Sequence, residues 1–320
     1  MKYHFKKWSD FMIISVSRRT DIPAFFSEWF MQRIKEGYVT YVNPYNQNKI
    51  HKISLKKEDV DVIVFWTKNP KPMIKYLKDL DSMGYKYYFQ FTLNNYSKII
   101  EPNLPSYLER IETFKNLSNM IGKERVILRY DPIILSDITD FNYHINNFSK
   151  LIRDLSNYTQ RVVISFLDDY RGSISRFKKT GINLVNYSFD DKNFRDFVKI
   201  IADIAKQNNL EIYSCAEVVD LEKEGILNGK CIDDKYIKKV FNIDVSNRKD
   251  AGQRKECGCV MSRDIGEFDT CLHKCVYCYA NRADSIIDKK VKNHNKNSPS
   301  LIGWHDVKEK PELEQISFWD

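Results

Sequence analysis

Three cysteines of one short segment, Cys271, Cys275 and Cys278, have the residue type and the spacing that an iron–sulfur cluster requires. Their C-x3-C-x2-C pattern delivers three thiolates from a single loop, and cysteine thiolate is the standard protein ligand of such clusters. Three thiolates bind three irons of a [4Fe–4S] cluster and leave the fourth iron open. The pattern therefore predicts a [4Fe–4S] cluster whose open iron can bind a small molecule.

The remaining cysteines allow a second metal site or a different metal. Five of the 7 cysteines lie between residues 257 and 278, which an even scatter along the chain does not explain. Zinc is the alternative metal, because structural zinc takes four ligands that often come in C-x2-4-C pairs. For Cys215 and Cys231 the alternative is an ordinary buried thiol, and for Cys257 and Cys259 it is redox or thiyl chemistry. The candidate second site, for an auxiliary cluster or zinc, consists of Cys215, Cys231, Cys257 and Cys259.

Six β-prone runs alternate with stretches of helical spacing, which is typical of β/α units and a parallel sheet. The expected strands are 12–17, 60–66, 85–91, 125–130, 161–166 and 210–214. The expected helices are 26–36, 72–83, 104–121, 143–157 and 191–207, and a hairpin is expected over 38–55. We predict an α/β fold, a parallel (β/α) partial or full TIM-like barrel of about six core strands. The cysteine loop would be supplied to it from the C-terminal part of the chain.

The chain divides by pattern into three segments. Residues 12–218 form the expected barrel core, and residues 219–303 form a helical and loop segment that carries the cysteine cluster and packs on the barrel. Residues 304–320 are a tail. An α/β barrel can use a chain of this length as one principal domain.

Polar side chains follow the predicted strands at the points where they end. In a parallel barrel these ends lie on one face, where barrel enzymes build their sites. Long cations on that face favour a ligand that is anionic or carries a carboxylate, although turn-forming polar residues are common after strands. The candidate catalytic residues are Arg18, Arg19, Asp21, Lys68, Arg129, Asp131 and Glu217.

Composition limits the class of protein. No apolar run approaches the roughly 20 residues that cross a bilayer, and the N-terminus has no signal-peptide pattern. We therefore expect a cytoplasmic protein without a membrane partner, in which thiols stay reduced. The formal net charge of +8 makes nucleic acid a minor hypothesis for a partner, because lysine is abundant throughout the chain.

Several runs beyond the cysteines resemble a bacterial domain-of-unknown-function family, DUF1848, over about residues 12–303. The runs that carry the likeness include 17–24, 65–70, 90–93, 129–133, 215–217, 229–233 and 257–259. The cysteine segment, with Tyr277 before its last cysteine, resembles the cluster motif of radical S-adenosylmethionine enzymes. A weaker likeness connects runs 65–70 and 129–133 with the spore photoproduct lyase group, a radical enzyme that acts on DNA.

The radical-enzyme likeness implies S-adenosylmethionine on the open iron and its one-electron cleavage to a 5′-deoxyadenosyl radical. It also implies a reductant such as flavodoxin or ferredoxin, and a substrate that the sequence does not identify. Tyr277 is expected to pack against the adenine, and His273 to lie beside the cluster ligands rather than among them. The other cofactor-binding candidates are Thr67, Asn69, Gln90 and Thr92.

One feature departs from the radical enzymes. Their cysteine motif follows the first barrel strand, whereas here it lies about 40 residues from the C-terminus. We expect the loop to fold back over the strand-end face. The alternative function is a non-catalytic or electron-transfer metalloprotein with a structural iron–sulfur or zinc site. An enzyme needs an open iron and a cavity above it, whereas a structural site needs four protein ligands and no cavity.

Overall fold

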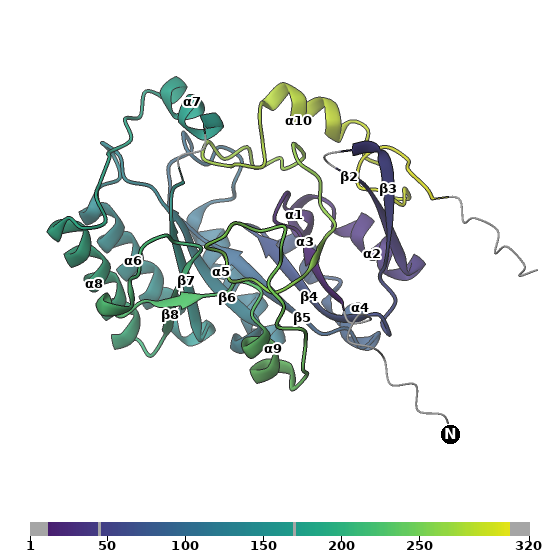
Figure 1. Ribbon diagram of the computed structural model, residues 1–320, viewed down its shortest axis with the longest axis horizontal. Coiled ribbons are helices and arrows are strands. Elements are labelled where there is room, and N and C mark those ends of the chain that lie inside the picture. Colours follow the sequence, from purple (N-terminus) through teal and green to yellow (C-terminus); the bar gives the residue numbers. More distant parts are fainter. Residues whose placement is uncertain (1–11, 44–45, 169–170, 308–320) are drawn as a thin grey trace, which may run out of the picture.

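The structure, a computed structural model, describes residues 12–43, 46–168 and 171–307. It is built on one eight-stranded parallel sheet with the order β10-β1-β4-β5-β6-β7-β8-β9 (Figure 1). The strands are β1 (Met12–Val16), β4 (Val60–Thr67), β5 (Tyr87–Thr92), β6 (Val126–Ile133), β7 (Arg161–Phe166), β8 (Glu211–Cys215), β9 (Leu227–Gly229) and β10 (Arg263–Asp264). All six expected core strands are present, and the parallel α/β fold is confirmed.

The central strands are apolar along most of their length because both faces of the sheet are covered. In β4 only Asp61 and Trp66 are partly exposed, and in β5 only Thr92 is. Such continuous apolar runs, rich in β-branched and aromatic residues, are typical of parallel strands. The edge strands β9 and β10 have three and two residues, which is too short for a recognisable pattern. The sequence analysis therefore missed them.

The sheet is open and does not close into a barrel. Within the described ranges β10 and β9 form its two edges, because no pairing connects them. One face packs instead against the C-terminal segment, where Ile232, Tyr236 and Ile237 fill the space. Apolar side chains from five strands meet them, namely Ile13, Val62, Val64, Tyr88, Ile127 and Val163. The prediction of a full barrel is therefore corrected. The sheet is open, and side chains of the C-terminal segment pack against one of its faces.

Helices cover the other face and the ends of the sheet. Side-chain caps start several of them; at α5, Ser106 and Glu109 form a reciprocal capping box. The expected helix 72–83 is split in two, the helices over residues 22–25 and 171–180 were not expected, and the helices over residues 234–241 and 284–291 lie in the segment 219–303 that was expected to consist of helices and loops. The helices are α1 (Ile22–Phe25), α2 (Ser27–Glu36), α3 (Lys71–Ile74), α4 (Leu77–Ser82), α5 (Tyr107–Ile121), α6 (Phe141–Leu155), α7 (Arg171–Thr180), α8 (Lys192–Gln207), α9 (Asp234–Phe241) and α10 (Asp284–Val291). Short 3-10 turns are η1 (Lys123–Arg125), η2 (Ser156–Tyr158) and η3 (Glu222–Glu224).

The expected hairpin is confirmed as an antiparallel pair, β2 (Tyr38–Asn43) and β3 (Asn46–Ser54). Figure 1 shows it beside the yellow end of the chain. There the Thr40 amide donates to the Pro299 carbonyl at 2.9 Å, and Trp29 Nε1 donates to the Ser298 carbonyl at 2.9 Å. Most of the predicted tail, residues 308–320, lies outside the described residues. No helix in the described part of the chain combines the length and the apolar character needed to cross a membrane.

Candidate functional site

A cavity of about 400 Å³ opens at the carboxyl ends of the parallel strands. This volume lies within the roughly 300–1,000 Å³ that ligand pockets occupy. Residues 17–21 after β1, Lys68 after β4 and Asp168 after β7 contribute to its wall, together with residues 271–281 of the C-terminal segment. All seven cysteines of the chain line this one cavity. Sequence spacing predicted two cysteine groups, and the fold brings both to the same space.

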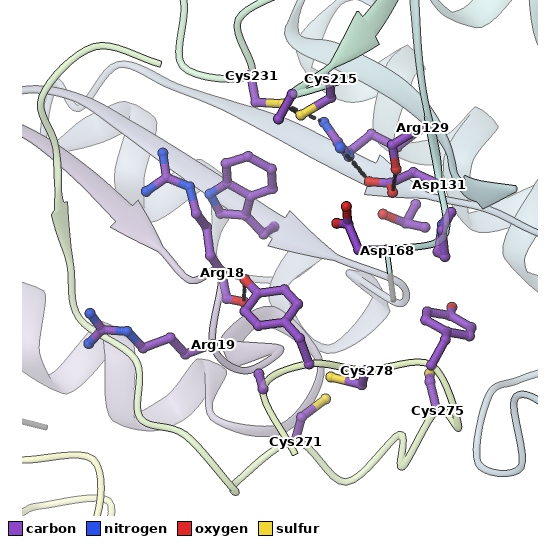
Figure 2. A pocket seen from close by; sticks show the side chains of 18 of the residues that line it. Arg18, Arg19, Arg129, Asp131, Asp168, Cys215, Cys231, Cys271, Cys275 and Cys278 are labelled. Atoms are coloured by element: carbon purple, nitrogen blue, oxygen red, sulfur yellow. Dashed lines mark hydrogen bonds and ion pairs between the residues drawn. The ribbon is translucent and has the colours of Figure 1, made fainter. Parts of the chain in front are cut away.

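The two cysteine groups occupy different sides of the cavity. Figure 2 shows Cys271, Cys275 and Cys278 along one loop, with Cys215 and Cys231 across the cavity from them. We call residues 271–278 the cysteine loop, and Cys215, Cys231, Cys257 and Cys259 the four-thiol group. Residues of the cysteine loop and residues at the strand ends line the same cavity.

A buried histidine–carboxylate pair holds the cysteine loop to the sheet. His273 Nε2 lies 2.8 Å from Asp21 Oδ2, and the two side chains are only 2% and 5% exposed. Asp21 Oδ2 also accepts from the Lys68 amide at 2.7 Å, and Asp21 Oδ1 accepts from the Ala24 amide at 3.0 Å. One carboxylate therefore connects the ends of β1 and β4 with the loop. His273 is not at the surface, and it lies beside the cysteines as a positioning residue.

A second buried carboxylate holds the other end of the loop. The Tyr277 hydroxyl donates to Glu101 Oε1 at 2.5 Å, and Lys68 Nζ donates to the same oxygen at 3.1 Å. Arg110 Nη1 lies 3.8 Å from Glu101 Oε2. Burial, together with the neighbouring Cys275 and Glu101, raises the pKa of the Tyr277 hydroxyl well above its ordinary value. Glu101 was not predicted as a site residue, because it lies in a loop after β5 with no motif around it.

Arg176 of α7 fixes the backbone of the loop. Its Nε donates to the Val276 carbonyl at 2.7 Å, its Nη1 donates to the Asn281 carbonyl at 2.8 Å, and its Nη2 donates to the Cys278 carbonyl. Asn281 Nδ2 in turn donates to the Cys271 carbonyl at 2.9 Å. Because these carbonyls are satisfied by side chains, the loop keeps its shape without regular secondary structure. No sequence pattern marked Arg176 for this role.

The three thiols of the cysteine loop are shielded from solvent. Burial raises the pKa of Cys271 and of Cys278, and raises that of Cys275 to about 12. A metal binds the thiolate form, so ligation by these cysteines would release protons. Among the residues that the structure describes, no three or more His, Cys, Asp or Glu side chains stand in an arrangement that could hold a metal ion. Cluster ligation by Cys271, Cys275 and Cys278 therefore stays a prediction.

The four-thiol group forms a continuous chain of sulfur contacts. Cys215 Sγ and Cys231 Sγ are 2.8 Å apart. Hydrogen bonds with Cys231 and then with Cys257 lower the pKa of Cys259, and its Sγ accepts from the Ile232 amide at 3.4 Å. A hydrogen bond with Cys231 likewise lowers the pKa of Cys215. Four cysteines separated by up to 44 positions therefore lie in one part of the cavity wall, and their use as a second metal site stays a prediction.

Two arginines, Arg18 and Arg129, lie beside the four-thiol group and close to the Trp66 ring. Arg129 Nη1 donates to Cys231 Sγ at 2.9 Å, and its Nε donates to Asp131 Oδ2 at 2.9 Å. The guanidinium carbons of Arg18 and Arg129 lie 5.1 and 5.3 Å from the centre of the Trp66 ring. Burial alone would lower the pKa of Arg18, but Cys259, Asp264 and Cys231 raise it above its ordinary value. These buried cations favour negative charge in the cavity.

The other sequence candidates divide into two groups. Thr67 and Thr92 line the cavity, whereas Asn69, Gln90 and Glu217 are not among its lining residues. Gln90 Nε2 donates instead to the Cys231 carbonyl at 2.6 Å, and Glu217 Oε1 accepts from the Phe166 amide at 2.8 Å. The guanidinium of Arg19 lies over the Phe268 ring, 5.1 Å from its centre. Trp66, Ser165 and Arg254 also line the cavity and were not predicted as site residues.

A comparison with protein-family models matches residues 13–280 to the family described as "Domain of unknown function (DUF1848)". The chain belongs to this family. The matched range contains all seven cysteines and every strand-end residue of the cavity. No match was found among curated proteins or among solved structures. The match establishes the family and assigns no activity to the chain.

Proposed function

We propose that this chain is a radical S-adenosylmethionine-type enzyme whose cysteine loop holds a [4Fe–4S] cluster in the strand-end cavity. The observation that carries the proposal is the anchoring of the loop on β1 and β4 through His273 and Asp21. Three thiols from one loop are the donor set for three irons of such a cluster. Their place in a cavity wall, rather than in a closed core, leaves space on one side for a further ligand.

Unpartnered polar atoms support a ligand in this cavity. Arg18 Nη2, Thr20 Oγ1 and His273 Nδ1 are buried and have no hydrogen-bond partner, and all three residues line the cavity. Buried polar groups in folded proteins are almost always satisfied, so each such atom calls for a partner. A ligand with carboxylate, amine or hydroxyl groups provides such partners. The donor set and the surrounding polar atoms therefore fit a cluster with a polar cofactor beside it.

The roles of the chain's own residues follow from their contacts. The cluster, when bound, would supply an electron for reductive cleavage of S-adenosylmethionine. Arg18 offers a guanidinium donor that suits the carboxylate of an amino-acid ligand. Asp131 stays ionised, because burial is outweighed by Arg129 and by the Ser165 hydroxyl, which together lower its pKa. Its oxygens keep acceptor capacity for ribose hydroxyls.

The proposal also includes a redox partner. A cluster that acts once per turnover has to be reduced again by one electron, and flavodoxin or ferredoxin is the class of donor that does so. The cysteine loop is held by Asp21, Glu101 and Arg176 from three different elements. These contacts hold the three sulfurs in place at the cavity wall while an external protein delivers the electron.

The test is anaerobic reconstitution of the full chain with iron and sulfide, followed by electron paramagnetic resonance of the dithionite-reduced protein. We expect a [4Fe–4S]⁺ signal that changes when S-adenosylmethionine is added, and 5′-deoxyadenosine in the reaction mixture. A signal that ignores the cofactor, with no 5′-deoxyadenosine, would instead support an electron-transfer or structural cluster and overturn the enzyme proposal.

Variants separate the proposed cluster from other iron. Cys278→Ser removes one proposed ligand and should abolish both the cofactor-dependent change and 5′-deoxyadenosine. Leu108→Ser is the matched control, because Leu108 lies on α5 with 69% of its surface exposed. The control should behave as the unmodified chain does. An unchanged signal and unchanged 5′-deoxyadenosine in Cys278→Ser would mean that the iron is not held by the loop.

A further inference from the structure

The four-thiol group joins the two edges of the open sheet. Cys215 ends β8, and Cys231 follows β9 by two residues, at one edge. Cys257 and Cys259 precede β10, which forms the other edge. The amide of Val260 donates to the carbonyl of Ile232 at 3.1 Å, so the segments next to the two edge strands are in backbone contact beside the thiols. The group therefore lies where a barrel would close but the strands do not pair.

We propose that Cys215, Cys231, Cys257 and Cys259 form a second metal site, a tetrathiolate that binds one soft divalent ion of the zinc type. Thiolates select such ions, and four of them complete the tetrahedron of a structural zinc site. The ion would cross-link the two edges of the sheet. This site goes beyond the proposed function and does not depend on it, because it shares no ligand with the cysteine loop.

The spacing of the sulfurs favours one ion over a cluster. Cys215 Sγ and Cys231 Sγ are 2.8 Å apart, and Cys259 is hydrogen-bonded to Cys231 and Cys257. In a tetrahedron with Zn–S bonds of about 2.3 Å the sulfurs are about 3.8 Å apart. In the part of the chain that the structure describes, no three of these side chains already stand in a metal-binding arrangement, so ligation requires the side chains to rotate, with the closest pair separating by about 1 Å. A [4Fe–4S] cluster, with four irons between its ligands, would require a larger separation.

The charges around the group agree with thiolate ligands. Four thiolates and one divalent ion carry a net charge of −2, which has to be compensated when it is buried. Arg129 Nη1 already donates to Cys231 Sγ at 2.9 Å. Arg18 Nη2, buried in the same cavity wall, has no hydrogen-bond partner. Binding releases the thiol protons to solvent and involves no change of oxidation state, so no further reactant is needed.

The experiment uses the full chain in which Cys271, Cys275 and Cys278 are all changed to Ser, so that the cysteine loop cannot contribute metal. Zinc, iron and acid-labile sulfide are measured after loading with Zn²⁺ and removal of excess. We expect about one zinc per chain, and, after loading with Co²⁺, the absorption spectrum of a tetrahedral tetrathiolate. A chain without retained metal, or one with iron and sulfide in place of a single ion, would overturn the proposal.

Further changes in the same background test the ligands. Cys231→Ser should lower Zn²⁺ affinity by about 100-fold or more, because one of four ligands is lost. Cys257→His keeps a zinc ligand, so it should retain the ion and shift the Co²⁺ spectrum. Met261→Ala is the control, since this half-exposed thioether lies in the same segment and should change nothing. Equal Zn²⁺ affinity in the Cys231→Ser and control chains would exclude the site. Circular dichroism of each chain verifies that a loss of metal is not a loss of folding.

Discussion

His273 Nε2 and Asp21 Oδ2 are 2.8 Å apart although 252 positions separate the two residues in the sequence. Asp21 follows the first strand of the sheet, where its other contacts are the amides of Lys68 and Ala24. The pair therefore brings a C-terminal cysteine motif to the end of β1. A motif that directly follows the first strand is placed at its end by the chain itself. Here the motif is distant in sequence, and a side-chain contact places it there instead.

Asp21→Ala is expected to lower the free energy of unfolding by about 3 kcal/mol. The change removes an acceptor for three donors, and buried donors left without partners each cost about 1–3 kcal/mol. Urea unfolding measures the loss, and limited proteolysis within residues 271–278 reports whether the loop is released. Asp190→Ala is the control, because that side chain is 97% exposed, and its effect should stay within about 0.5 kcal/mol. Equal effects of the two changes would remove Asp21 from its anchoring role.

Glu101 and Tyr277 should be energetically coupled. Tyr277→Phe removes the hydroxyl that donates to Glu101 Oε1, and Glu101→Gln removes the charge that Lys68 Nζ contacts at 3.1 Å. A double-mutant cycle on unfolding free energies should give a coupling of about 1–3 kcal/mol, as for a hydrogen bond to a buried charged group. Ser106→Ala, at the capping box of α5, should add to Tyr277→Phe without coupling. A coupling near zero between Glu101 and Tyr277 would contradict the anchoring contact.

Local pattern was sufficient to predict most of the fold. The bounds of strands such as β4 and β7 were predicted to within a residue. Their continuous runs of Val, Ile and Phe are typical of parallel strands that are buried on both faces. The edge strands β9 and β10 were missed, since their pairing is decided by the segments around them. Closure of the barrel could not be judged from the sequence either. It depends on whether the edge strands pair, and within the described ranges β9 and β10 do not.

Site residues that form a local sequence pattern were predicted. Site residues that are far apart in the sequence and meet only in the folded protein were missed. C-x3-C-x2-C is a local pattern, so Cys271, Cys275 and Cys278 were selected as one group, and they lie in one loop. Glu101 and Arg176 hold that loop, but each acts alone across 100 or more positions. A single buried carboxylate or arginine has no sequence signature. Gln90 belongs to a run that carries the family likeness and Glu217 follows a strand, and the side chains of both instead bond backbone groups.

Stability should fall with rising pH because of Glu217. Burial raises the pKa of this carboxyl from 4.5 to about 8, and the nearby Asp168 adds to the effect. Between these pH values the unfolded chain gives up the proton while the folded chain keeps it. The stabilisation from Glu217 is therefore complete below pH 4.5 and is lost as pH rises to about 8.

Glu217→Gln keeps an oxygen acceptor for the Phe166 amide and removes the titration. Urea unfolding at several pH values should show a flatter profile for this variant between pH 4.5 and 8. Glu112→Gln, with a side chain 73% exposed, should keep the slope of the unmodified chain. An unchanged slope in Glu217→Gln would mean that Glu217 is ionised in the folded protein.

His144 should act in the opposite direction, on the acid side. Its Nε2 donates to the Ile134 carbonyl and its Nδ1 accepts from the Tyr130 hydroxyl, both at 2.8 Å. Burial lowers its pKa from 6.5 to about 4. The unfolded chain binds the proton first as pH falls, so the stabilisation from His144 is complete above pH 6.5 and is lost towards pH 4. Nuclear magnetic resonance of the imidazole should show no titration near pH 6.5, and a midpoint there would contradict the buried, neutral ring.

Gly266 should not tolerate a side chain, because the segment after β10 passes directly over the end of β1. A Cβ at this position would lie 2.0 Å from Ser17 Oγ and 2.6 Å from Ser17 Cβ. Ser17 Oγ donates to Asp264 Oδ1 at 2.6 Å and cannot move without losing that bond. Gly266→Ala should therefore lower the free energy of unfolding by about 2–3 kcal/mol.

Two further comparisons make the Gly266 test specific: a control substitution at another glycine, and the same Gly266→Ala change in a chain that lacks the Ser17 side chain. Gly172→Ala in α7 places its Cβ 3.4 Å from Arg176 Nη1, an ordinary contact, and alanine favours a helix over glycine by up to about 1 kcal/mol. Its unfolding free energy should stay equal or rise. In the Ser17→Gly background the clash partner is gone, so Gly266→Ala should cost clearly less than in the unmodified chain. Equal costs in both backgrounds would show that the close approach to Ser17 does not determine the need for glycine, and the docking of the β10 segment on β1 would then require another explanation.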